Sequence, residues 1–287
     1  MHIPVLEREI MEFLRVESGR YFFDGTLGMG GHTKAILSAN SNAMVYAVDR
    51  DGESIKIASS NLMEFKDRIK IIKANFKEIF NLSLPLKKID GFLFDLGISS
   101  FQVDNPEYGF SYAKDSPLDM RMDKEQELTA EIVVNDYSYN ELIRVLRDYG
   151  EFKKPERLVK EILLARKKKR LKTSRELKEV IRSIYKKRKT MDPLARVFQA
   201  IRIEVNRELS ELGEFFLKLS QEMKKGSRIA VISFHSLEDR IVKRSFKKAA
   251  ELGLLKIITK KPIAPSQEEK DKNPRSRSAK LRVGERI

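Results

Sequence analysis

YFFDGTLGMGGHT, residues 21–33, is the stretch that decides the fold. A short apolar run ends in Asp24, four glycines follow within seven residues, and the helix-compatible segment 34–37 comes next. Glycine lets a backbone turn at positive φ or approach a ligand closely. Strand, glycine loop and helix in this order predict a βα unit, whose loop lies at the edge of a parallel sheet where nucleotide-like cofactors bind.

The next strand narrows the choice of cofactor. Residues 44–48 end in Asp49, about 20 residues after the loop, where a carboxylate can bind ribose hydroxyls. Thr33 occupies the last glycine position of the dinucleotide fingerprint, and no P-loop motif is present. An acid, a glycine loop and a second acid are typical of S-adenosylmethionine (SAM) methyltransferases. SAM carries an ammonium and a sulfonium but no pyrophosphate, so an acid-lined loop suits it.

Two later strands add to this edge. Residues 69–72 form a third strand that leads to Phe76, which is either an adenine-stacking ring or a core aromatic. Residues 89–95 form a fourth strand that ends in Asp95. Because parallel strands end at the same edge of a sheet, we expect three acids to line one crevice: Asp24, Asp49 and Asp95.

Composition excludes several classes of protein. The chain has 287 residues, is 41% hydrophobic and contains no cysteine, which excludes disulfides, thiolate metal sites and cysteine nucleophiles. Methylation of cytosine at C5 normally needs such a nucleophile, so we do not expect it. Only three histidines are present, and we expect no metal site. No run reaches membrane-span length and no signal peptide opens the chain, so we expect a cytoplasmic protein.

The positive charge indicates a polyanionic partner. The net charge is +15, and residues 151–190 hold 17 Lys and Arg against 5 Glu. We expect RNA contacts at Lys167, Lys168, Lys169 and Arg170, with a solvated helix face as the alternative. Residues 260–278 are rich in Lys, Arg, Pro and Ser and predict a mobile basic loop, with Arg275 and Arg277 on phosphates or plain disorder as the alternative.

Helical patterns separate the two halves of the sheet. After a helical lead-in within residues 1–18, the βα alternation stops near residue 106 and resumes at 228–234, followed by a closing strand pair at 254–259 and 279–283. The helical patterns cover residues 140–149, 155–169 and 173–187, and a long helix that starts at Asp192-Pro193 and extends to Leu209. We therefore expect an inserted helical substrate-recognition domain at 106–205 and a cofactor domain at 1–105 and 206–287.

Six motifs resemble those of one enzyme family. They are DGTLGMGGHT (24–33), DLGISSFQ (95–102), PLDMRM (117–122), RVFQAIR (196–202), SFHSLEDR (233–240) and NPRSRS (273–278). They resemble the bacterial 16S ribosomal RNA (cytosine-N4)-methyltransferases over nearly the whole chain. The resemblance implies an α/β class I SAM-dependent methyltransferase fold, a Rossmann-like mostly parallel sheet with an all-helical insertion. It also implies methyl transfer to the N4 amine of a cytidine in the decoding region of the small ribosomal subunit.

The resemblance also implies site residues. SAM contacts fall on Gly30, Gly31, His32, Asp49, Phe76, Asp95 and Gln102, whereas Phe101 stands where other members often have proline. Asp95 and His235 are the catalytic candidates, Asp95 for orienting the amine and His235 for orienting the base. Ser236-x-x-Asp239 is alternatively only a helix cap.

Three questions stay open from the sequence. The oligomeric state is not determined, a homodimer included. An amino-methyltransferase acting on another RNA or on DNA would share this cofactor fold. A basic RNA-binding or ribosome-assembly protein with a vestigial cofactor site is the alternative from a different class.

Overall fold

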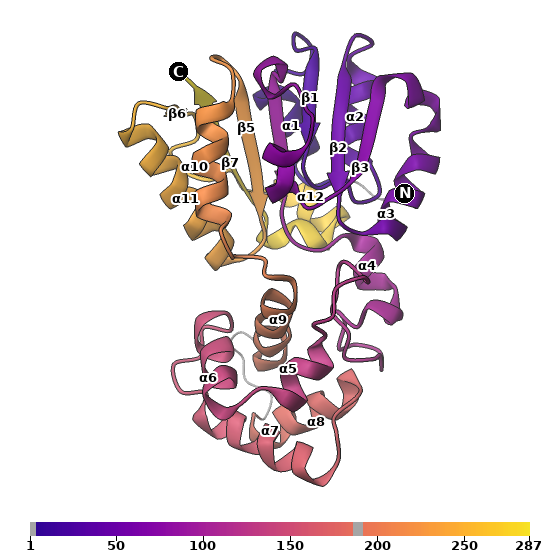
Figure 1. Cartoon of the computed structure of the whole chain (residues 1–287), viewed down its shortest axis with the longest axis vertical. Coiled ribbons are helices and arrows are strands. Elements are labelled where there is room, and N and C mark those ends of the chain that lie inside the picture. The colour runs from indigo at the N-terminus through magenta and orange to yellow at the C-terminus, as the bar shows by residue number, and fades with distance from the viewer. Residues whose placement is uncertain (1–3, 186–191) are drawn as a thin grey trace. The chain divides into compact units, whose positions relative to one another are not determined.

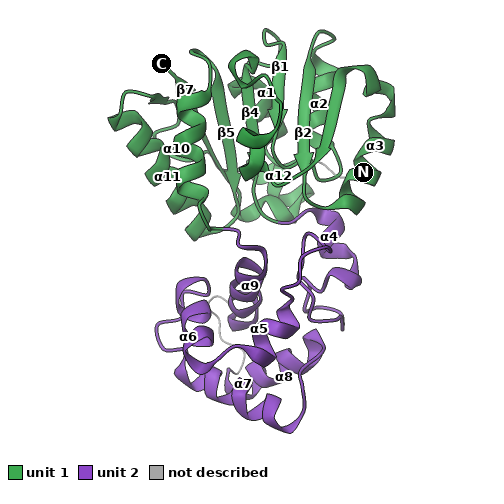
Figure 2. Cartoon of the chain, viewed as in Figure 1, with its two compact units in different colours: residues 1–97, 209–287 green, residues 98–208 purple. Residues whose placement is uncertain are grey.

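The computed structural model describes residues 4–185 and 192–287. The chain forms two compact units, one of residues 1–97 and 209–287 and the other of residues 98–208 (Figure 2). The boundaries expected from the sequence, 105/106 and 205/206, both fall within the second unit. None of the helices in the described ranges is long and apolar enough to cross a membrane.

The first unit contains a seven-stranded sheet in the order β3-β2-β1-β4-β5-β7-β6 (Figure 1). The strands are β1 (Tyr21–Asp24), β2 (Met44–Asp49), β3 (Ile69–Lys73), β4 (Gly91–Asp95), β5 (Arg228–Ser233), β6 (Leu255–Ile257) and β7 (Lys280–Arg286). The first five run parallel, whereas β7 is antiparallel to both of its neighbours. This confirms the predicted class I sheet and the closing strand pair. The strand order reverses between β1 and β4, which places a ligand crevice at their carboxyl ends.

Helices cover both faces of this sheet. Side chains alternate along a strand, so Phe22 of β1 belongs to one core cluster and Phe23 to the other. Helices α1 (Glu7–Phe13), α2 (Gly31–Ala39) and α3 (Gly52–Asn61) pack on the first face. Helices α10 (Leu212–Glu222) and α11 (Ser236–Glu251) pack on the second.

The segment 260–278 is more ordered than its composition predicts. It contains helix α12 (Gln267–Lys272) and a 3₁₀ helix at Pro274–Ser278, so the prediction of a mobile loop is wrong. Ser266 caps α12 by accepting a hydrogen bond from Glu269 N–H, and the Glu269 carboxylate accepts one from Leu6 N–H at 2.8 Å. Ser276 is fully buried. These contacts hold the segment in a defined conformation, which its Lys- and Arg-rich composition does not predict.

The second unit is helical around one core. Its helices are α4 (Ser100–Asp104), α5 (Ala130–Asp136), α6 (Tyr139–Asp148), α7 (Glu156–Lys168), α8 (Ser174–Ile184) and α9 (Pro193–Asn206). The predicted capping box of Thr173 is present at α8, and Lys186 and Lys187 of that predicted helix lie outside the described residues. Helix α9 starts at the predicted Asp192-Pro193 but ends at Asn206, because Arg207 adopts a left-handed conformation at φ 48°. The predicted extension to Leu209 is therefore wrong.

Candidate cofactor site at the carboxyl edge of the sheet

The glycine loop lies between β1 and α2 and is fastened to β2. Gly28 and Gly30 have φ of 51° and 85°, in the left-handed region that glycine adopts most readily. A Cβ on Gly30 would lie 2.8 Å from the Leu62 side chain. The N–H of Leu27 donates to Val48 O of β2 at 3.0 Å. The loop is thus held close to the end of the second strand.

Asp24 anchors the same loop from within. Its carboxylate is buried and accepts from Thr26 N–H at 3.1 Å and from the Thr33 hydroxyl at 2.7 Å. Burial raises the pKa of Asp24 above its usual value, against these hydrogen bonds. The sequence indicated Asp24 only as one of three acids in the crevice. The signal for its anchoring role is Thr33, which stands where a dinucleotide loop has glycine and reaches back to the carboxylate.

Asp49 links the end of β2 to the loop. Its Oδ2 accepts from Gly28 N–H at 2.7 Å, and its Oδ1 accepts from Asp51 N–H at 2.9 Å. Burial raises the pKa of Asp49 from 3.8 to about 6, although both N–H groups favour the charged form. A carboxylate oxygen has two lone pairs. Each oxygen therefore keeps the capacity to accept a ribose hydroxyl while it holds the loop.

His32 and Asp95 face each other across this edge. His32 Nε2 lies 3.7 Å from Asp95 Oδ2, and the Asp95 N–H donates to Thr26 Oγ1 at 2.6 Å. Burial lowers the pKa of His32, but Asp95 and Asp24 outweigh it and raise that pKa overall. Both His32 ring nitrogens and Asp95 Oδ1 are buried without a hydrogen-bond partner among the described residues. Buried polar atoms are normally paired, so this cluster has the unused polar capacity that a bound ligand would satisfy.

Two other predicted cofactor residues lie in different settings. Phe76 is half-buried, with its ring centroid 5.3 Å from that of Phe94 and 5.0 Å from that of Phe215. It therefore belongs to the core, and its contact with adenine stays a prediction. Gln102 is buried in the 98–208 unit, where it forms a capping box with Ser99 at the start of α4.

His235 is held by Glu238 at the start of α11. The ring Nδ1 accepts from Glu238 N–H at 3.4 Å, and the Glu238 carboxylate accepts from Phe234 N–H at 2.9 Å. The expected cap of Ser236 with Asp239 is wrong, because the box lies one residue earlier and Asp239 instead pairs with Arg282 at 2.6 Å. Imidazole is not among the common N-cap groups. His235 Nε2 is buried and lies 3.1 Å from Glu238 Oε1.

Comparison with known proteins decides the family. The model that matches residues 1–287 is described as the MraW methylase family. This chain belongs to that family. The ribosomal RNA small subunit methyltransferase H of Sulfurihydrogenibium sp. (strain YO3AOP1) is 46% identical over 291 residues, with 100% of this chain and 99% of the relative covered. The protein of the same name in Persephonella marina (strain DSM 14350 / EX-H1) is 45% identical, with the same coverage.

Family and fold together define the enzyme class. The protein is a SAM-dependent methyltransferase, and its cofactor is S-adenosylmethionine. This confirms the predicted reaction class and cofactor. A solved rRNA methylase from Streptococcus thermophilus aligns over 100% of this chain and 99% of its own, at 11% identity and a TM-score of 0.42.

The cations of the methyltransferase that were predicted to bind RNA differ in their surroundings. Lys167 and Lys168 are exposed at the end of α7, and no ion pair joins either to another described residue. Lys169 Nζ lies 2.6 Å from Glu176 Oε1. Arg170 binds both carboxylate oxygens of Asp136, at 2.8 and 3.0 Å, and Glu131 Oε1 at 2.7 Å. Arg275 and Arg277 are both exposed in the C-terminal segment.

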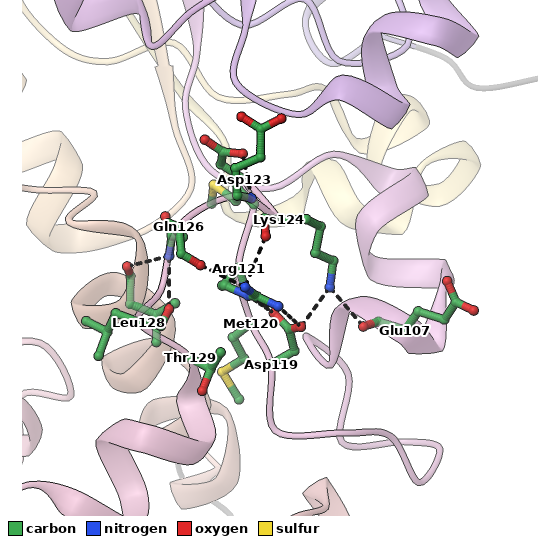
Figure 3. Close-up of polar contacts among 12 residues, drawn as sticks. Glu107, Asp119, Met120, Arg121, Asp123, Lys124, Gln126, Leu128 and Thr129 are labelled. Carbon is green, nitrogen blue, oxygen red and sulfur yellow. Dashed lines mark hydrogen bonds and ion pairs between the residues drawn. The ribbon is translucent and has the colours of Figure 1, made fainter.

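The PLDMRM motif of the methyltransferase encloses a satisfied charge network in the second unit (Figure 3). Arg121 Nε and Nη2 donate to the two oxygens of Asp119 at 2.9 and 3.0 Å. Arg121 Nη1 donates to the backbone oxygens of Lys124 and Gln126, at 3.0 and 2.7 Å. Lys124 Nζ lies 3.0 Å from Asp119 Oδ2 and donates to Glu107 O. The sequence indicated this motif only by its resemblance to the family.

Proposed function

We propose that the protein transfers a methyl group from SAM to the exocyclic N4 amine of a cytidine in the decoding region of 16S rRNA. The observation that carries this is similarity along the whole chain to proteins named ribosomal RNA small subunit methyltransferase H. The small ribosomal subunit is then the partner, and the cytoplasm is the compartment. The oligomeric state stays open, with a homodimer as one alternative, and light scattering on the purified chain tests it.

The reaction sets two demands on the protein. An exocyclic cytosine amine is a poor nucleophile because its lone pair is delocalised into the ring. SAM supplies an activated methyl group bonded to a sulfonium. The protein has to align amine and methyl in line and accept a hydrogen bond from the amine. Both demands favour an acceptor fixed at the crevice.

Asp95 fits the accepting role. Its backbone N–H is fixed by Thr26, while its buried Oδ1 has no partner among the described residues. We assign Asp95 to orienting the cofactor or the amine. We assign His32 to holding the Asp95 carboxylate through Oδ2, the oxygen that faces its Nε2. Gly30, Gly31, Asp49, Phe76 and Gln102 complete the proposed cofactor contacts. His235 keeps its proposed role toward the base, although Glu238 already holds its ring.

We assign phosphate contacts to the exposed cations named above. Lys167 and Lys168 are available as they stand, whereas Lys169 and Arg170 would have to exchange acidic partners for phosphates. Glutamate at Lys167 and Lys168 should therefore weaken RNA binding and flatten its salt dependence, because each phosphate contact releases counterions. RNA affinity unchanged across a salt series would return these lysines to a solvated face. Arg275 and Arg277 are assigned to phosphates because both are exposed in the C-terminal segment.

Methyl transfer from labelled SAM to small ribosomal subunits that lack the modification tests the proposal. Nucleoside analysis should find the label on N4 of one cytidine. Label on another atom or base would keep the enzyme class and overturn the substrate. Naked 16S rRNA in parallel shows whether assembled subunits are needed.

A further inference from the structure

Helix α11, which packs on one face of the sheet (Figure 1), carries a stripe of cations on its outer face. All five are exposed at helical spacing: Arg240, Lys243, Arg244, Lys247 and Lys248. The inner face of the helix, with Val242, Phe246 and Ala249, is buried in the core. No acid interrupts residues 240–248, a span of about 12 Å along the helix axis.

Helix stability does not account for this stripe. Arg240 and Arg244, Arg244 and Lys248, and Lys243 and Lys247 are like-charged pairs four residues apart. Each such pair destabilises a helix by about 0.2–0.5 kcal/mol. The helix dipole favours cations only in the last turn, where Lys248 lies. The sequence thus keeps a repulsive arrangement where alternating Glu and Lys would be more stable.

The acids of α11 do little to neutralise the stripe. Glu238 is committed to the His235 cap, and Asp239 pairs with Arg282 and Lys280. Glu251 reaches Lys247 at 3.6 Å. Within residues 4–185 and 192–287, no ion pair involves three of the cations: Lys243, Arg244 and Lys248. The cations between α7 and α8 differ from these three, because Lys169 and Arg170 already have carboxylate partners.

We propose that the outer face of α11 binds the phosphate backbone of the substrate RNA, as a second contact outside the 98–208 unit. This rests on the proposed function. A membrane surface would require an exposed apolar face, and that of α11 is used in the core. Helix α11 starts directly after β5, at the sheet edge that holds the cofactor site. Contacts to phosphates fix register and orientation without reading sequence, so the stripe orients RNA that extends from this edge along α11.

Neutralising the three cations without ion pairs tests the proposal. The variant is Lys243→Gln, Arg244→Gln and Lys248→Gln, and glutamine keeps helix propensity. The matched control is Lys56→Gln, Lys66→Gln and Lys70→Gln, which removes the same charge from exposed sites near the opposite, β3 edge of the same sheet. Each phosphate contact contributes about 0.7–0.9 to the slope of log affinity against log salt. The α11 variant should lose about 2–3 of that slope and about tenfold in affinity for small subunits, whereas the control keeps both.

Further measurements separate the outcomes. SAM affinity and the melting temperature should match those of the unmodified chain in both variants. An unchanged salt slope in the α11 variant overturns the proposal. The proposal is also overturned if the variant binds RNA as well as the unmodified chain does and loses binding only to small-subunit proteins prepared without RNA. If the unmodified chain binds the RNA but leaves N4 of its cytidines unmethylated, the proposed function fails, and the slope still decides whether α11 contacts RNA.

Discussion

The cofactor edge and the PLDMRM segment are both rich in charged groups but differ in how those groups are satisfied. At the edge, both His32 nitrogens and Asp95 Oδ1 are buried without a hydrogen-bond partner among the described residues. In the segment, Arg121 and Asp119 have their charges matched by each other, by Lys124 and by backbone oxygens. Unmatched buried polar atoms are costly, whereas matched ones hold a fold together. The difference predicts that the edge serves binding and catalysis and that the segment serves stability.

Asp95→Asn should have the largest effect of the substitutions that test the cofactor edge. The amide keeps the shape but loses the carboxylate acceptor, so kcat should fall by about 100-fold or more. The melting temperature should stay nearly the same, because Asp95 Oδ1 has no hydrogen-bond partner among the described residues and Oδ2 lies 3.7 Å from His32 Nε2. Labelled methyl transfer and thermal unfolding measure the two effects. Asp67→Asn, at an exposed acid, is the control, and full activity of Asp95→Asn would remove Asp95 from the site.

Arg121→Ala tests the segment in the opposite way. It breaks a two-pronged pair with Asp119 and leaves two backbone oxygens without their donor, so we expect a loss of about 2–3 kcal/mol in unfolding free energy. SAM affinity should be unchanged. Arg147→Ala is the control, since its pair with Glu156 is exposed and should matter by less than about 1 kcal/mol. Equal stability of the two variants, measured by urea unfolding, would contradict the comparison.

The strands were predictable because strand and glycine loop leave local signals. Apolar runs that end in acids located β1, β2 and β4, and their order along the chain gave the parallel sheet. The short helices α5 and α12 were not predicted, since seven and six residues give too little periodicity. Their caps, Thr129 and Ser266, are the local signals that were available.

The candidate site was predictable in its residue types but not in its contacts. The motifs led to His32, Asp49 and Asp95, yet the bonds from Asp24 to Thr33 and from Asp49 to Gly28 depend on how the loop folds back. The Arg121 network is local in sequence, since Arg121 binds only Asp119, Lys124 and Gln126 within the described residues, but which oxygens its guanidinium meets depends on how this loop folds. Sequence patterns specify which groups are present, and packing decides which of them remain unmatched.

Asp49 and Asp119 should contribute to stability with opposite pH dependence. Its folded pKa of about 6 exceeds the ordinary 3.8, so its contribution to stability is full below pH 3.8 and is lost as the pH rises through about 6. Asp119 behaves oppositely. Burial raises its pKa, but Arg121 and Lys124 outweigh burial and lower the pKa overall, so its contribution to stability is lost as the pH falls.

Cofactor binding should follow the ionisation of Asp49. The carboxylate is the better acceptor for ribose hydroxyls, so the SAM dissociation constant should fall severalfold as the pH rises through about 6. Calorimetry from pH 5 to about 7 measures this, within the range where Asp49 changes charge. Asp49→Asn should bind SAM more weakly with a flatter profile, and Asp67→Asn should keep the original profile. A profile in Asp49→Asn that matches the unmodified chain would assign the titration to another group, such as His32.

His235 combines features of the cofactor edge and of the PLDMRM segment, and substituting it should have the smallest effect on activity and stability. Its Nδ1 is used as a helix cap, while its buried Nε2 lies 3.1 Å from Glu238 Oε1 and has no hydrogen-bond partner among the described residues. His235→Ala should cost about 1 kcal/mol of unfolding free energy, the usual loss for an N-cap, and leave kcat unchanged if capping is its whole role. His235→Asn supplies a preferred cap and should restore stability. If kcat is low in both variants while stability returns in His235→Asn, the imidazole acts on the substrate as well as capping α11, and His235 belongs with Asp95 rather than with Arg121.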